Sequence, residues 1–127
     1  MRALLDTCTF LWLAGGGTLS PAAAAIVRDP SNDVLLSAVS VWEIVVKHRS
    51  GRLPLPEPPA KLIATERRLR GVDTLPFDEE SALQVVRLPL LHRDPFDRML
   101  ISQAIAHSLV LLTPDPAISQ YPIRVIW

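Results

Sequence analysis

The chain has 127 residues, enough for one domain with a substantial core and too few for two domains of ordinary size. Hydrophobic residues make up 49% of the sequence and charged residues 20%, a composition typical of a soluble globular domain. The formal net charge is zero, so the chain as a whole lacks the strongly basic character of many nucleic-acid-binding proteins. We therefore expect a single domain over residues 1–127.

The charge is unevenly distributed along the chain. Residues 47–70 contain seven lysines and arginines and two acids, whereas residues 72–97 contain two arginines and six acids. An anionic ligand would fit across the boundary between these segments. An arginine-rich, solvated helix face explains the basic segment equally well.

The sequence gives no sign of export or of a membrane span. Cys8 is the only cysteine, so no internal disulfide can form and nothing indicates an oxidising compartment. Asp6 interrupts the apolar N-terminal run, so we do not expect a secretory signal peptide. No segment reaches the roughly 20 apolar residues needed to cross a bilayer. We expect a cytoplasmic protein with no membrane partner.

Strands and helices are predicted to alternate along the chain. The predicted strands cover residues 2–6, 34–37, 109–113 and 123–127, with a short edge strand at 74–77. The predicted helices cover residues 7–14, 21–29, 38–50, 61–70, 78–86 and 94–107. Ser20 and Pro21 begin the second helix, and Gly51 and Gly71 end the third and fourth. This alternation predicts an α/β fold with a mainly parallel central sheet of four to five strands.

Four acidic residues are predicted to meet at one edge of this sheet: Asp6, Glu43, Asp97 and Asp115. In a parallel α/β sheet, the carboxyl ends of the strands and the first turns of the following helices share one edge, where ligands bind. Two of the acids follow predicted strands, and the other two lie near the starts of predicted helices.

Helix capping offers an alternative explanation for two of these acids. Asp6 and Asp115 can each cap the turn that follows, and capping is compatible with a place at the edge of the sheet. Asp94 precedes Pro95 and is the natural cap of its helix. We therefore favour Asp97 over Asp94 as the chemically active residue.

Glu43 is the most informative of the four because apolar residues surround it in the sequence VSVWEIVV. An acid inside a mostly buried helix is costly unless it is paired or bound to a metal. An ion pair with Lys47, one helical turn later, is the alternative explanation.

A cluster of carboxylates predicts a hard divalent cation, because the acids would otherwise repel one another. Ligand sets made only of oxygen favour Mg²⁺ or Mn²⁺, and no cysteine pair or histidine spacing indicates zinc. With no P-loop and no Gly-x-Gly-x-x-Gly motif present, the sequence points to metal-dependent phosphoryl chemistry.

Other residues are weaker candidates for a role in the site. Thr113 is suited either to binding a ligand or phosphate or to capping. Arg98 is suited either to holding a phosphate or to pairing with Asp94 or Asp97. Cys8 is expected to be a small core residue rather than a nucleophile. The three histidines, His48, His92 and His107, are scattered and are expected to be structural.

Four sequence blocks resemble the PIN-domain ribonucleases, and specifically the VapC-type toxins of toxin–antitoxin pairs. In chain order the blocks are LLDTCTFLWL, SVWEIVVKHRSGRL, HRDPFDRMLISQA and LLTPDPAISQYPI. The resemblance covers nearly the whole chain. One departure is that Pro114 and Pro116 bracket Asp115, where the family more often has a flexible Thr-x-Asp segment, and they could hold Asp115 away from a metal.

The resemblance implies a three-layer α/β/α sandwich that cleaves RNA with Mg²⁺ or Mn²⁺. It also implies a homodimer and a cognate antitoxin whose tail covers the active-site groove. Asp6 and Asp97 would be the core metal ligands, while Glu43 and Asp115 would complete the pocket or act through water. Helices 38–50 and 61–69 are the expected dimer and antitoxin surfaces, and the basic segment the expected RNA surface.

Two alternative functions are open at this point. One is a catalytically degenerate PIN-like module that only binds RNA or a protein partner; the presence of all four acids disfavours it. The other is a receiver-like phosphoacceptor domain. It would need paired acids after the first strand and a lysine late in the chain, but only Asp6 ends that strand and no lysine follows Lys61.

Overall fold

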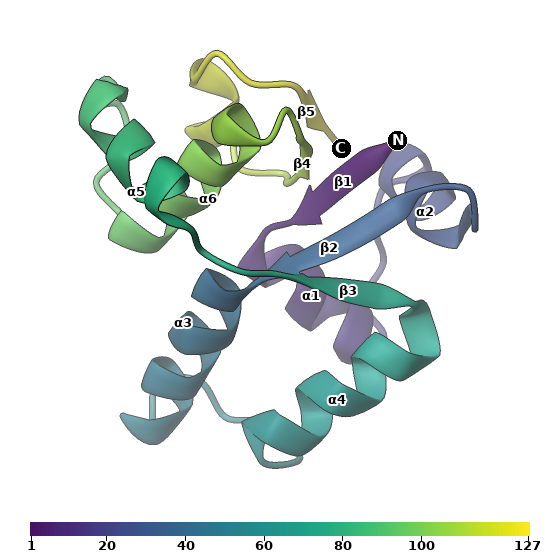
Figure 1. Ribbon diagram of the computed structural model, residues 1–127. Helices are drawn as coiled ribbons and strands as arrows, with labels where there is room; N and C mark the ends of the chain where they lie inside the picture. The colour runs from purple at the N-terminus through teal and green to yellow at the C-terminus, as the bar shows by residue number, and fades with distance from the viewer.

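The computed structural model describes residues 1–127, which are built around one sheet of five parallel strands (Figure 1). The strands are β1 (Arg2–Leu5), β2 (Asp33–Ser37), β3 (Val72–Leu75), β4 (Val110–Leu112) and β5 (Val125–Ile126). Their order across the sheet is β3-β2-β1-β4-β5, and every neighbouring pair is parallel. The predicted parallel sheet of four to five strands is confirmed.

Six α-helices connect the strands. They are α1 (Thr7–Ala14), α2 (Pro21–Arg28), α3 (Ala38–Arg49), α4 (Pro59–Arg70), α5 (Glu79–Gln84) and α6 (Pro95–Ala106). The 3₁₀ turn η1 (Val85–Arg87) continues α5, and a second 3₁₀ turn, η2 (Ile118–Gln120), precedes β5. Gly71 ends α4 in the left-handed conformation at φ 65°, which a residue without a side chain adopts at little cost.

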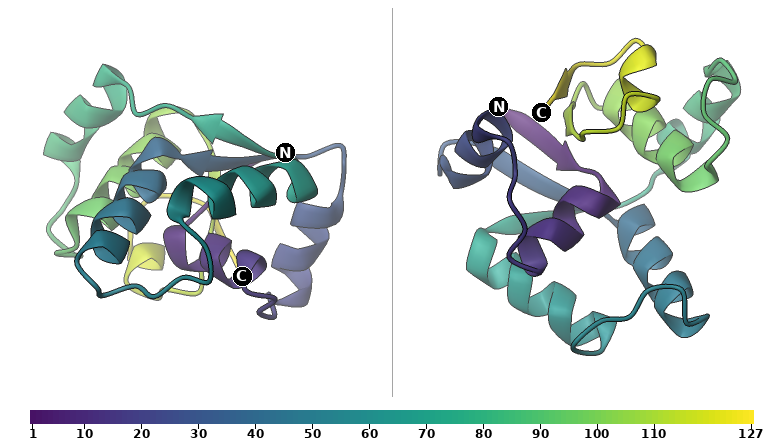
Figure 2. Two further views of the ribbon diagram at one scale, coloured as in Figure 1. Left: turned by 90° about the horizontal axis from the view of Figure 1, so that it is seen from below. Right: turned by 180° about the vertical axis from the view of Figure 1, so that it is seen from behind.

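Helices cover both faces of the sheet and make three layers. On one face, Leu5 and Leu36 pack in a core with α1, α2 and α4. On the other face, Leu4 and Leu35 pack in a second core with α6, against which α5 lies. Neighbouring strand residues point to opposite faces, so each strand serves both cores. Figures 1 and 2 show α5 and α6 on the opposite side of the sheet from α4, which confirms the α/β/α sandwich.

The order of the strands fixes where a ligand can reach the sheet. The chain runs outward from the central strand β1 through β2 to β3, and then crosses to β4 on the other side of β1. In open α/β sheets, ligands bind at such a reversal, outside the carboxyl ends of the two strands. Asp6 directly follows β1, and Thr113 directly follows β4. None of the helices combines the length and the apolar character that a membrane crossing demands.

Candidate functional site

A pocket of about 240 Å³ lies at the carboxyl edge of the sheet, between the ends of β1 and β4. Its lining is Asp6, Thr7, Cys8, Trp12, Glu43, Lys47, Asp94, Asp97, Pro114 and Asp115. The sequence predicted that the first strand end, α3, α6 and the segment after β4 would each bring an acid to this edge. The structure brings all four acids into this one pocket.

Asp6 is buried, with 5% of its surface exposed, and both of its carboxylate oxygens accept hydrogen bonds. Oδ1 accepts from the backbone amide of Thr9 at 2.7 Å, so Asp6 caps α1 as the alternative explanation proposed. Oδ2 accepts from the hydroxyl of Thr113. Burial raises the pKa of Asp6, against the opposing effect of these hydrogen bonds. Asp6 therefore both caps α1 and lines the pocket.

Glu43 is buried in α3 and is held by two neighbours. Its Oε1 accepts a hydrogen bond of 2.7 Å from the Thr7 hydroxyl, whose oxygen also lies 2.9 Å from Ser40 Oγ. Its Oε2 pairs with the Lys47 ammonium one turn later. Glu43 thus forms the predicted ion pair with Lys47 and also lies among the acids of the pocket, as predicted.

Asp97 lies in the first turn of α6, and Asp94 caps the same helix. Asp94 Oδ1 accepts from the amides of Phe96 at 2.8 Å and Asp97 at 3.3 Å, as the sequence predicted for a residue before Pro95. Burial and the nearby charge of Asp94, together with Glu43, raise the pKa of Asp97 to about 7, while His92 opposes the shift. A carboxyl group with this pKa can hold or release a proton near neutral pH.

Asp115 lies in the pocket despite the prolines on either side of it. Its amide donates to Thr113 Oγ1 at 3.1 Å, and its Oδ1 accepts from the amide of Ala117 at 2.9 Å. Thr113 is 2% exposed and joins Asp6 to the Asp115 backbone. This threonine therefore positions two of the four acids.

His92 joins two of the acids, although the sequence predicted only a structural role for it. Its Nε2 lies 3.0 Å from Asp97 Oδ2 and 3.2 Å from Asp115 Oδ2. Its Nδ1 accepts a hydrogen bond of 3.1 Å from the Asp94 amide, so a proton carried by the neutral ring is on Nε2 and faces the carboxylates. These three side chains also form a geometry able to hold a metal ion. The only sequence signal for His92 was its place two residues before Asp94.

Two other residues differ from what the sequence indicated. Arg98 is not brought to the pocket. Its guanidinium donates to the carbonyl of Pro89 at 2.9 Å and to the Tyr121 hydroxyl at 3.2 Å, and it forms no ion pair. Cys8 is exposed at the pocket rather than buried in the core, so the expectation of a core residue was wrong. The thiol itself is partly shielded from solvent in the pocket, and this desolvation, with the charges of Asp6 and Glu43, raises the pKa of Cys8, which disfavours a reactive thiolate.

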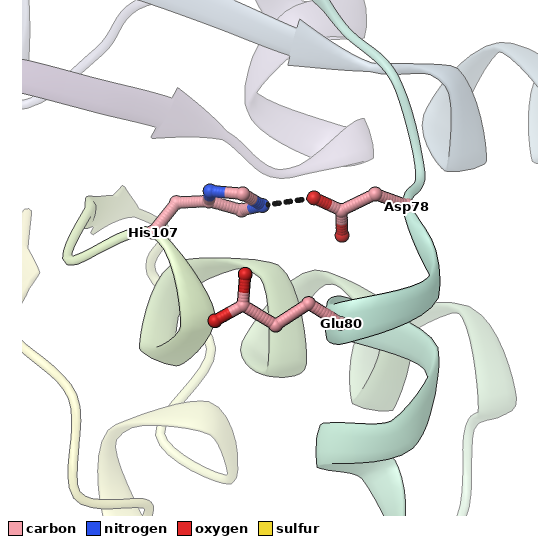
Figure 3. A group of neighbouring side chains, drawn as sticks. All are labelled: Asp78, Glu80 and His107. Carbon is pink, nitrogen blue, oxygen red and sulfur yellow. Dashed lines mark ion pairs between the residues drawn. The ribbon is translucent and has the colours of Figure 1, made fainter.

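A second group of acids and a histidine lies outside the pocket (Figure 3). His107 at the end of α6 points at Asp78, which caps α5, with Nε2 and Oδ2 2.7 Å apart. Glu80 in α5 completes the group. The Asp78 side chain is 41% exposed, and the pair joins the end of α6 to the start of α5. Helix capping and helix packing account for these contacts.

The largest cavity is elsewhere and contains no acid. It measures about 570 Å³ and is lined mainly by α2 and the turn before it, together with Leu13 of α1 and Arg70 of α4. Of the cavities, only the smaller pocket at the carboxyl edge of the sheet is lined by carboxylates, which is why we place the chemistry there.

The chain belongs to the PIN domain family. The family model matches residues 3–123, nearly the whole sequence. Over 54 residues, 42% of this chain, the sequence is 46% identical to Ribonuclease VapC16 of Mycobacterium tuberculosis. That alignment spans 38% of the relative's length. The family assignment and this relative confirm the resemblance that the four sequence blocks predicted.

Solved structures of the same fold include VapBC complexes. The chain superimposes with a TM-score of 0.75 on VapBC2 from Rickettsia felis, at 14% identity, covering 99% of this chain and 98% of that one. The TM-score is 0.71 for VapBC from Salmonella typhimurium, at 17% identity, covering 99% and 97%. It is 0.63 for the toxin–antitoxin protein VapBC-5 from Mycobacterium tuberculosis, at 20% identity, covering 98% and 97%. At these identities the likeness establishes the fold.

Proposed function

We propose that this protein is a metal-dependent endoribonuclease that hydrolyses phosphodiester bonds in RNA, acting as the toxin of a toxin–antitoxin pair. One observation carries the proposal. Asp6, Glu43, Asp97 and Asp115 arrive from four separate segments of a PIN domain and line one pocket at the switch point of the sheet. The partial match to a ribonuclease of the VapC group supports RNA as the substrate.

The donor set of the pocket fits Mg²⁺ or Mn²⁺. Four carboxylates supply only oxygen ligands, which these hard cations prefer. Burial and, after it, the neighbouring charges of Asp94 and Glu43 raise the pKa of Asp97, and a bound cation would offset both effects. We assign Asp6 and Asp97 as the core ligands, with Glu43 and Asp115 completing the pocket or acting through water. When bound, the cation would activate water and stabilise the leaving oxygen of the phosphodiester.

The residues around the acids hold the carboxylates in place before substrate binds. Asp6 is fixed by the Thr9 amide and the Thr113 hydroxyl, and Glu43 by Thr7 and Lys47. Fixed ligands lose little conformational freedom when the reaction begins, which favours catalysis. His92 places a proton between Asp97 and Asp115 and offsets part of their repulsion.

Cleavage of a bulk RNA pool by the purified protein tests the proposal. With Mg²⁺ or Mn²⁺ we expect discrete fragments, which disappear in EDTA and in the Asp97→Asn variant. Asp73→Asn is the matched control, because Asp73 is an exposed acid on β3 outside the pocket. The rate should fall more than about a hundredfold in Asp97→Asn and remain unchanged in Asp73→Asn.

The catalytically degenerate alternative makes the opposite prediction. A degenerate module would bind RNA or a protein partner but yield no fragments under any metal condition. An Asp97→Asn variant as active as the wild type would also refute the proposed active site. Calorimetric titration with Mn²⁺ separates the cases, because only an intact metal site takes up the ion.

We further propose that residues 1–127 act as a single cytoplasmic domain that forms a homodimer and binds a cognate antitoxin. The solved relatives are VapBC complexes, which supports a protein partner of this kind. Exposed apolar side chains on α3 and α4, namely Trp42, Val45 and Leu69, are suitable for such contacts. Light scattering coupled to gel filtration tests the dimer. The toxin proposal is tested by expressing the protein in bacteria. Wild-type protein should arrest growth, co-expression of the antitoxin should relieve the arrest, and the Asp97→Asn variant should not cause it.

A further inference from the structure

Two residues of the pocket lining are neither acids nor small side chains. They are Trp12 from α1 and Lys47 from α3. Trp12 is the only aromatic residue and Lys47 the only lysine or arginine among the ten lining residues. They share the pocket with five carboxylates, those of the four predicted acids and of Asp94. A polyanion such as RNA approaches such a pocket only where attractive contacts offset this negative charge.

Lys47 provides one such contact. Its ammonium pairs with Glu43 Oε2 and lies 6.0 Å from the centre of the Phe96 ring, so the charge is held beside the acids. An ammonium has three donors, and the pair with Glu43 uses one of them. The Lys47 side chain is 34% exposed, which leaves the remaining donors available to a phosphate.

Trp12 provides a contact of a different kind. It is 42% exposed although it is a large apolar residue in a helix beside the core. Its ring packs against that of Trp127, whose centre lies 5.6 Å away, and a 2.6 Å hydrogen bond from the Gly17 amide to the Trp12 carbonyl holds its backbone. A Cβ at Gly17 would lie only 3.0 Å from the Trp12 Cβ, so glycine permits this close approach. A fixed, exposed indole is a surface on which a nucleobase can stack.

From these contacts we infer that Trp12 and Lys47 select single-stranded RNA for the pocket: Lys47 binds a backbone phosphate, and Trp12 stacks an unpaired base beside it. The inference rests on the proposed ribonuclease function and names two residues that determine its specificity. Bases in a duplex are stacked on one another, so their faces are unavailable to an aromatic side chain. Single-stranded segments expose those faces, and stacking tolerates any of the four bases.

RNA binding measured without cleavage tests the inference. Fluorescence polarisation with a labelled single-stranded RNA is read in Ca²⁺, which uses oxygen ligands like those of Mg²⁺ but with longer bonds. We expect Trp12→Ala to weaken binding about tenfold with an unchanged salt dependence. Lys47→Met should lower the slope of log Kd against log salt by about 0.7, the value for one phosphate contact on a single strand. Trp12→Phe should retain most of the wild-type affinity, and Lys47→Arg should retain most of the wild-type salt slope.

Matched controls come from the same chain. Trp42 is 61% exposed on α3 and does not line the pocket, and Lys61 is the only other lysine. Trp42→Ala and Lys61→Met should leave affinity and salt slope unchanged. The wild type should bind the annealed duplex at least about tenfold more weakly than the single strand, and Trp12→Ala should remove this preference. Circular dichroism and the thermal midpoint verify that each variant is folded.

Failure of this inference differs from failure of the proposed function. The inference would be overturned if Trp12→Ala weakened RNA binding no more than Trp42→Ala, or if Lys47→Met changed the salt slope no more than Lys61→Met. Cleavage by the wild type would still support the proposed function. A wild type that prefers the duplex would also overturn the inference. A wild type that neither binds nor cleaves RNA would overturn both, and would favour a module that binds only a protein.

Discussion

Asp97 carries the clearest electrostatic signature among the residues of the pocket. Burial is the largest cause of its raised pKa, and the charges of Asp94, Glu43 and Asp6 add to it. His92 acts in the opposite direction from 3.0 Å away. A group that is easily protonated near pH 7 and surrounded by acids is suited to exchange a proton for a cation.

Metal affinity should therefore increase with pH. Because a proton on Asp97 competes with the cation, the apparent Kd for Mn²⁺ should fall by up to about tenfold per pH unit below about pH 7 and level off above it. Isothermal titration calorimetry between about pH 5.5 and 8 measures this change. An affinity that stays constant over that range would contradict the role of Asp97. In Asp97→Asn, the part of the pH dependence that comes from this group should be absent.

Thr113 should matter for activity through its hydroxyl group. Thr113→Val preserves the shape of the side chain but removes the hydrogen bonds to Asp6 and to the Asp115 amide. We expect the cleavage rate to fall about ten- to hundredfold, as for other residues that orient metal ligands. Ser102→Ala is the control, because it removes a hydroxyl that is buried outside the pocket and has no hydrogen-bond partner. Equal losses of activity in the two variants would indicate a general packing effect.

At the scale of elements, the start of α6 serves structure and chemistry with two different acids. Asp94 satisfies the free amides of the first turn, and Asp97 projects into the pocket from the same turn. Pro95 needs no hydrogen-bond partner at the first position of the helix. The helix therefore begins at a fixed residue, and this fixes where Asp97 lies.

Replacing Asp94 should separate its capping role from its charge. Asp94→Ala should cost about 1 kcal/mol of stability because the cap is lost, whereas Asp94→Asn should be nearly neutral because asparagine also caps helices. Both variants should lower the pKa of Asp97, since the Asp94 charge is the second cause of its rise. Urea denaturation and carboxyl-carbon NMR titration give the two measurements. The capping assignment would be wrong if alanine and asparagine proved equally stable.

The elements and the meeting of the acids could be predicted because their signals are local. Apolar runs mark the strands, while Asp94–Pro95 and the glycines mark helix ends. An acid among apolar neighbours, as in the case of Glu43, indicates a site. His92 and Arg98 could not be placed in this way, because both interact through loop segments without periodicity. Their partners depend on how residues 88–94 and the Tyr121 region fold over α6.

For the whole molecule, the concentration of acids in one pocket should make stability depend on pH. Asp97 and Asp6 have pKa values raised above those of the unfolded chain, so the folded state binds more protons in the intervening range. Stability should therefore fall as the pH rises from about 4 to about 7, with Asp97 contributing a slope of up to about one proton. Thermal unfolding measured across this pH range tests whether stability falls or rises with pH. Mg²⁺ or Mn²⁺ should reduce the loss, and a stability that increased with pH would contradict the assignment.

The central place of β1 in the sheet also has a consequence for folding. Ala3 pairs with Val34 on one side and with Val110 on the other. The edge of β1 that faces β4 therefore stays unpaired until a strand more than a hundred residues later is available. Closing so long a loop is slow, and an unpaired edge between two apolar faces is prone to join other chains. Because Asp115 lies beyond that late pairing, the pocket cannot assemble on a ribosome until nearly all of these residues have emerged. If the pocket cleaves RNA as proposed, a nascent chain is inactive until synthesis is nearly complete, while its unpaired strand edge makes it prone to aggregate.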